Sequence, residues 1–311
     1  MLKEIVEQIL KGNFEQANEL ILNYNEDNLY NLVFSIAYDS STIAAYSFVV
    51  NLLIKKQSSE NHGLVAELLA LPLCFYHGAY SVALYHARKA IILDSTNNIE
   101  NTTFLILFHD IPEQLVSPQE AYQVATKILH VDPTVTVAQR VIKKYENGRF
   151  DTDISFLPVF KISALLTDRL TKEMYVLLNY AKFEEVRELV KDISLDQLFT
   201  MMTIISQQEQ TLTLYGYVVN LLLHQEIGVT HQLASRVLVE LLNTIEGVYV
   251  SAYWHAKRAV ELAPQEIEYK LWLLKFKTLP GDLLSNDEAV KLAHNIIDID
   301  PDNVEALTIR G

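Results

Sequence analysis

The amino-acid sequence predicts an all-α protein made of antiparallel helical hairpins in two homologous halves. Nine glycines and eight prolines in 311 residues are too few for a loop-rich β-protein, while leucine, isoleucine, alanine and glutamate are abundant. Apolar residues recur with a period near 3.6, which is typical of amphipathic helices. The sequence also matches itself when it is shifted along its own length, and a fixed internal period indicates a repeat architecture.

This self-match covers several segments at one shift. It aligns Tyr46 with Tyr215, the segment 49–53 with 218–222, and Phe14 with Phe183, in each case at a shift of 169. The same shift matches Gly78, Tyr80, Ala83, His86, Ala87 and Ala90 with Gly247, Tyr249, Ala252, His255, Ala256 and Ala259. A slip to 168 pairs the segment 120–138 with 288–306. We interpret the chain as a tandem duplication.

The first copy is predicted to span residues 1–163 and the second residues 164–311. Between them, Gly148–Asp153 and the following Pro158 form the most helix-breaking stretch in the middle of the chain. Gly311 corresponds to Lys143, so roughly twenty residues of the first copy have no counterpart. A continuation of the natural chain past Gly311 is one way to account for this.

Helix boundaries are predicted at matching places in the two copies. Residues 10–17 resemble a hairpin turn weakly, and residues 24–63 and 192–232 are helical by periodicity alone. Ser117 and Ser285 are each followed three residues later by glutamate, which predicts a capping box at a helix start. The same signal in both copies strengthens the helix prediction.

The segment from Gly78 to Asp94 resembles the second half of a tetratricopeptide repeat. It has glycine at the hairpin turn, Tyr80 two residues later, alanines where two helices touch, and an acidic stop. The spacing from Asp94 to Asp132 is close to the family period of about 34. The resemblance implies a right-handed superhelical stack of hairpins, a TPR-like α-solenoid.

Tetratricopeptide repeats bind partner proteins or peptides in a concave groove lined by the first helix of each hairpin. By register, the resemblance implies ten protein-binding residues on that face: Leu68, Phe75, Tyr76, Thr102, Ile106 and His109, with Val237, Leu241, Leu271 and Lys275 in the second copy. The alternative for each is a place in the helix core.

Composition narrows the class of partner. The net charge of −14 and the pI near 5.1 give a field that repels phosphate backbones and anionic lipid, so we expect no nucleic-acid partner and no membrane insertion. A basic protein would be attracted, although acidity also serves solubility. A single cysteine, Cys74, excludes an intramolecular disulfide framework. Without an apolar block after Met1, we expect a cytoplasmic protein of unknown oligomeric state.

No residue set predicts an enzyme, and we expect no catalytic residues, no metal site and no cofactor. The nine histidines contain no His-Glu-x-x-His spacing, and no phosphate-binding loop or nucleophile elbow occurs. His86 and His255 occupy matching sites, for which a packing hydrogen bond inherited through duplication is the favoured interpretation. Residues 298–309 open like a calcium loop but place Asn303 where glycine belongs.

The leading hypothesis is a protein-binding scaffold or adaptor. A second hypothesis is a substrate-recruiting region of a larger enzyme such as a glycosyltransferase, and a third is an immunity protein that neutralises a toxin. A longer reading frame would support the second, and a neighbouring toxin-like gene would support the third.

Overall fold

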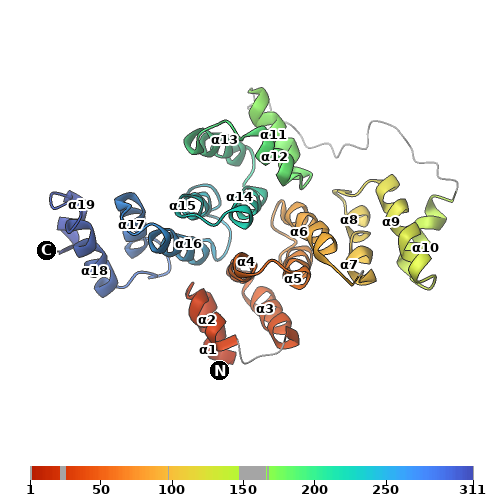
Figure 1. Ribbon diagram of the computed structural model, residues 1–311, viewed down its shortest axis with the longest axis horizontal. Helices are drawn as coiled ribbons and strands as arrows, with labels where there is room; N and C mark the ends of the chain where they lie inside the picture. Colours follow the sequence, from red (N-terminus) through yellow and green to blue (C-terminus); the bar gives the residue numbers. More distant parts are fainter. Residues whose placement is uncertain (1, 22–25, 97, 147–165, 167, 311) are drawn as a thin grey trace. The chain divides into compact units, whose positions relative to one another are not determined.

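The computed structural model describes the chain apart from residues 1, 22–25, 97, 147–165, 167 and 311 (Figure 1). Every regular element in the described part is a helix, which confirms the all-α prediction. The helix-breaking stretch at 148–153 and Pro158 lies outside the described residues.

Within each predicted copy the helices follow one another through short connections. Those encoded by the predicted first copy are α1 (Leu2–Leu10), α2 (Phe14–Ile21), α3 (Glu26–Ser40), α4 (Ala44–Lys55), α5 (Ser59–Ala70), α6 (Ala79–Leu93), α7 (Ile99–Phe104), α8 (Leu107–Asp110), α9 (Pro118–Val131) and α10 (Thr136–Lys144). Those of the second are α11 (Arg169–Asn179), α12 (Phe183–Leu189), α13 (Leu195–Gln208), α14 (Thr213–His224), α15 (Gly228–Arg236), a π-helical turn η2 (Val237–Leu241), α16 (Val248–Leu262), α17 (Ile267–Leu274), a 3₁₀ turn η3 (Lys275–Lys277), α18 (Asn286–Ile297) and α19 (Val304–Arg310).

The helix boundaries recur at the spacing of the sequence match. Helices α4 and α14 both have 12 residues, α6 and α16 both have 15, and within each pair the two starts are separated by the shift of 169. The starts of helices α9 and α18 are separated by the shift of 168. The two segments predicted to be helical by periodicity alone contain α3, α4 and the start of α5, and α13, α14 and the start of α15.

By internal contacts the chain divides into two compact units. Unit 1 combines residues Met1–Lys55 with Asp192–Gly311, and unit 2 is Lys56–Lys191. Unit 1 therefore holds α1–α4 and α13–α19, and unit 2 holds α5–α12. The copies 1–163 and 164–311 remain a prediction about the sequence, and the compact units are a different division.

The turns use the predicted glycines and caps. Gly78 and Gly247 precede α6 and α16 with φ of 79° and 81°, in the left-handed region that glycine adopts at little steric cost. Ser285 forms a complete capping box with Glu288. Ser117 also caps its helix, but the side chain of Glu120 pairs with Arg88 at 2.9 Å instead of closing the box.

A close helix–helix contact is expected to be sensitive to side-chain size at Ala256. This residue and Ala259, one turn later on α16, are both fully buried. Ala256→Leu should lower the free energy of unfolding by about 1 to 3 kcal/mol, because an overpacked seam pushes helices apart. Chemical denaturation checks this, with Val260→Leu on a half-buried face of α16 as the control. An unchanged midpoint for Ala256→Leu would contradict the close contact.

Candidate functional site

Unit 2 contains a groove of about 750 Å³ among α5, α6, α7, α8 and α10. Its walls come from α5 and from the α7–α8 segment. On α5 the contributing residues recur every three or four positions and so share one helix face. The lining residues are Gly63, Ala66, Glu67 and Leu71 on and after α5; Ala87 and Ala90 on α6; Ile99, Glu100, Asn101, Thr103, Phe104, Leu107 and Asp110; and Val135, Val137 and Arg140.

Small residues make the floor of this groove. Gly63 and Ala66 on α5 and Ala87 and Ala90 on α6 extend little beyond the backbone, so the paired helices leave open space above their seam. A Cβ added to Gly63 would meet no atom closer than 3.7 Å. Apolar side chains such as Phe104, which is half-buried, form the wall. The result is a concave, largely apolar surface of the kind that binds ligands.

The second copy has larger or polar residues at the matching positions. In the sequence match Ser235 corresponds to Ala66 at the shift of 169. Helices α7 and α17 start at Ile99 and Ile267, 168 residues apart, and by this spacing Trp272 corresponds to Phe104. The Trp272 indole donates to Ser235 Oγ at 2.7 Å and is only 8% exposed. The space beside Ser235 in unit 1 is therefore filled by protein, whereas the space beside Ala66 in unit 2 is open.

A charged pair follows Ser235 in the second copy. Arg236 and Glu240, which match Glu67 and Leu71, form an ion pair at 3.0 Å. The second copy thus has charged side chains paired with each other at the places where the first copy has two groove-lining residues.

The rim of the groove is acidic. Three carboxylates, Glu67, Glu100 and Asp110, line it together with one guanidinium, that of Arg140. Arg140 pairs with Asp110 at 2.8 Å, so its charge is offset locally. The lining therefore holds more carboxylates than guanidinium groups, and together with the net charge of −14 this favours a positively charged ligand.

None of the residues predicted to bind protein lines this groove. Leu68, Ile106, His109, Val237 and Leu241 are buried in the helix packing. Phe75 and Lys275 are exposed, and Tyr76, Thr102 and Leu271 are half-buried. Phe75 and Tyr76 together line a separate, smaller pocket of about 200 Å³, formed by the turn before α6, the start of α6, Glu113 and Asn179 at the end of α11. For these five accessible residues a role in binding remains a prediction.

The groove and the residues predicted to bind protein lie on different faces of α5 and of the α7–α8 segment. Glu67, Thr103, Leu107 and Asp110 line the groove, each one residue away from a predicted position. One residue along an α-helix turns the side chain by about 100°, so residues adjacent in sequence point from different faces of the helix. The small residues Gly63 and Ala66, spaced by three, are the sequence signal that could have located the floor.

Buried histidine pairs form a second conspicuous feature. His62 and His86 in unit 2 place their Nδ1 atoms 2.8 Å apart, and His231 and His255 in unit 1 do the same. All four side chains are fully buried. The packing hydrogen bond predicted for His86 and His255 is present, but its partner in each case is another histidine that sequence reasoning did not identify.

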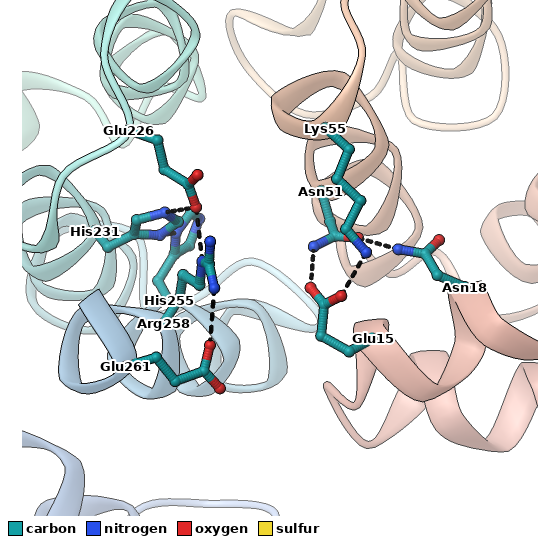
Figure 2. A network of polar contacts seen from close by, with 9 residues as sticks. All are labelled: Glu15, Asn18, Asn51, Lys55, Glu226, His231, His255, Arg258 and Glu261. Atoms are coloured by element: carbon teal, nitrogen blue, oxygen red, sulfur yellow. Dashed lines mark hydrogen bonds and ion pairs between the residues drawn. The ribbon is translucent and has the colours of Figure 1, made fainter.

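In unit 1 the histidine pair belongs to a longer chain of hydrogen bonds, whose charged end appears in Figure 2. His231 Nε2 lies 3.4 Å from Glu226, and Arg258 donates to the same carboxylate at 2.6 Å. The hydrogen bond from His231, together with Arg258, lowers the pKa of Glu226 to about 2. An ionised carboxylate only accepts, so His231 must donate from Nε2.

The remaining donors follow in order. With Nε2 protonated and burial lowering its pKa, His231 is neutral and accepts at Nδ1 from His255. His255 Nε2 then accepts from the Tyr215 hydroxyl at 2.9 Å, which accepts from Ser47 at 3.0 Å. Every hydrogen bond points the same way, toward Glu226. This series of hydrogen bonds joins α4, α14, α15 and α16 inside unit 1 and holds the histidines in fixed neutral tautomers.

Unit 2 lacks the carboxylate and guanidinium groups that end the series of hydrogen bonds in unit 1. Gln57 and Lys89 stand where unit 1 has Glu226 and Arg258, and Lys89 pairs with Glu184 at 2.8 Å. His62 Nε2 is buried without a hydrogen-bond partner among the described residues. Burial, reinforced by the positive charge of Lys89, lowers the pKa of His62 to about 4.

The described residues also show how far the chain meets the requirements of a metal site and of a membrane-spanning helix. No three histidine, cysteine, aspartate or glutamate side chains there are grouped to hold a metal ion. None of the helices described is both long and apolar enough to cross a membrane.

Among known proteins, no protein-family model matches the sequence, and no curated protein is significantly similar to it.

Proposed function

We propose that this protein is a non-enzymatic scaffold that binds a segment of a partner protein in the groove of unit 2. One observation carries the proposal: the groove is open beside Ala66 and Phe104, whereas Trp272 and Ser235 fill the matching position of the second copy. The two copies thus differ in the side chains at the position where a ligand would bind.

The groove favours a peptide that combines apolar and basic residues. Phe104, Leu107 and Leu71 offer an apolar surface on which one or two anchor side chains can be desolvated, and such anchors carry most binding energy. The acidic rim attracts lysine or arginine beside the anchors. The proposed ligand class is therefore a peptide segment with large apolar side chains flanked by Lys or Arg.

The helix arrangement is proposed to be tetratricopeptide-like, with right-handed stacking of hairpins in two homologous halves. The support comes from helix boundaries that recur at the spacing of the sequence match and from left-handed glycines at matching turns. The matching small residues Ala87 and Ala256 are both buried at the seam of a hairpin.

A peptide selection with a closed-groove variant tests the proposal. A displayed library of random peptides is selected on the wild-type protein, and the selected peptides are measured against Ala66→Ser/Phe104→Trp, which copies the second-copy residues. We expect peptides rich in aromatic or aliphatic residues and Lys or Arg, with affinity at least about tenfold weaker for the variant, because the indole would occupy the anchor position.

Two controls sharpen this test. Val260→Leu lies in unit 1 and should leave affinity unchanged, whereas Glu100→Lys should weaken binding in a salt-dependent way. Selected peptides that bind the closed variant as well as the wild type would exclude the groove as the binding site. Acidic selected peptides would contradict the charge argument.

A further inference from the structure

The N-terminal hairpin of the first copy packs on a helix of the second copy within unit 1. Phe14, fully buried at the start of α2, contacts Trp254 of α16 with ring centroids 5.0 Å apart, and Phe48 of α4 at 5.7 Å. Gly12, with φ of 72°, brings the α1–α2 turn so close to α16 that an added Cβ would lie 2.9 Å from the Val250 carbonyl oxygen. This contact therefore joins the two copies.

The corresponding hairpin of the second copy makes the reciprocal contact within unit 2. Phe183, at the start of α12, contacts Tyr85 of α6 with centroids 4.8 Å apart. Ser81 donates to the carbonyl oxygen of Asn179 at 2.6 Å. In the sequence match Phe183 corresponds to Phe14, and Tyr85 corresponds to Trp254. The first hairpin of each copy thus packs against the other copy.

Matching residues also meet each other. Inside unit 1, Tyr46 of α4 contacts Tyr215 of α14 edge to face, with centroids 5.4 Å apart. These two tyrosines are equivalent in the sequence match, and both are fully buried. Contact between a residue and its own equivalent is the mark of an isologous interface around a two-fold axis.

The first-copy hairpin is also tied to α4 by polar contacts. Figure 2 shows Glu15 of α2 accepting from Asn51, at 2.7 Å, and from Lys55 of α4, while Asn18 of the same hairpin contacts Asn51. The hairpin therefore moves with α4 and presents Phe14 as a unit to Trp254.

We propose that the chain is an internal pseudodimer, in which each copy packs its first hairpin reciprocally on the other copy and the surfaces that join them fit a second copy of the same half. Hairpins stacked within each half are compatible with this pairing, whereas one serial stack running through both copies would bury Phe14 against helices of its own copy alone. The covalent connection between the copies is then dispensable for their association once they are folded.

Cleavage of the intact protein tests this directly. A protease site inserted between residues 150 and 151 allows the folded chain to be cut between the copies. The two fragments should remain one complex with a mass close to that of the intact chain, 35.5 kDa, in size-exclusion chromatography with light scattering. Fragments that separate under native conditions while each keeps its helical circular dichroism would overturn the proposal.

Matched phenylalanine variants in the cleaved protein separate association from folding. Phe14→Ala and Phe183→Ala each remove a ring that crosses between copies and should weaken fragment association by about a hundredfold. Phe108→Ala removes an equally buried ring whose aromatic neighbour, Phe104, belongs to the same copy. It should lower stability without a comparable loss of association, and an equal loss in all three variants would contradict the two-fold pairing.

Discussion

Acidification from pH 7 to about 4.5 is expected to destabilise the folded protein through its buried histidines. His62 has a folded-state pKa of about 4, well below the ordinary value of 6.5, because burial and the charge of Lys89 oppose its protonation. Below pH 6.5 the unfolded chain binds a proton at this residue and the folded chain does not. The contribution of His62 to the free energy of unfolding is therefore fully present above pH 6.5 and is lost as the pH falls toward 4. The full loss from His62 is about 3 kcal/mol.

The other paired histidines act in the same direction. Burial lowers the pKa of His86, His231 and His255, so each adds to the loss below pH 6.5. Glu226 contributes only at lower pH, because its folded-state pKa is about 2 and the ordinary value is 4.5. Between pH 6.5 and 4.5 the histidines therefore dominate the pH dependence.

Urea denaturation at several pH values measures this dependence. His62→Gln keeps a side chain that can hydrogen-bond to His86 but cannot bind a proton, so the dependence of the free energy of unfolding on pH should become shallower between 6.5 and 4.5. Val65→Ala, at a fully buried position of the same helix, should lower stability equally at each pH. A wild-type stability that stays constant over this range would show that the histidines titrate normally in the fold.

Gly247→Ala is expected to lower the free energy of unfolding by about 3 kcal/mol or more. The left-handed backbone conformation alone accounts for about 1 to 2 kcal/mol of this loss. Gly247 has φ of 81°, and an added Cβ would clash with Thr42 Oγ1 and lie 3.1 Å from the Ala44 backbone nitrogen. Ile43 donates to the neighbouring Glu246 carbonyl at 2.9 Å, so the start of α4 is held at this turn and cannot move away freely.

Two comparisons isolate the cause of this loss. Gly281→Ala also places an alanine at positive φ, 107°, but its Cβ approaches only the flexible Leu283 side chain at 3.2 Å, so the cost should be smaller. Thr42→Ala in the Gly247→Ala background should recover part of the stability by removing Oγ1. If thermal and urea denaturation place Gly247→Ala level with Gly281→Ala, the close approach of α4 to this turn is incorrect.

Local sequence was enough to predict the all-helical content of the described residues and several of the turns and helix caps. Hydrophobic periodicity, helix caps and glycines in left-handed turns depend on residues within about four positions along the chain. The roles of Gly78, Gly247 and Ser285 could therefore be predicted without tertiary contacts. The seam alanines at 87 and 256 belong to the same class of local signal, because small side chains at a hairpin mark close helix approach wherever the hairpin packs.

Three features became visible only in the folded chain: the copy against which each hairpin packs, the face of α5 that lines the groove, and the partner of each buried histidine. Phe14 and Phe183 are the same residue type at equivalent positions of the sequence match. Local sequence patterns therefore cannot distinguish packing within a copy from packing across copies. The groove depends on one pair of differences, Ala66 with Phe104 against Ser235 with Trp272, whose effect requires the two helices to be adjacent. Long-range packing sets such contacts, because a buried face is complementary to a neighbour that is often distant in sequence.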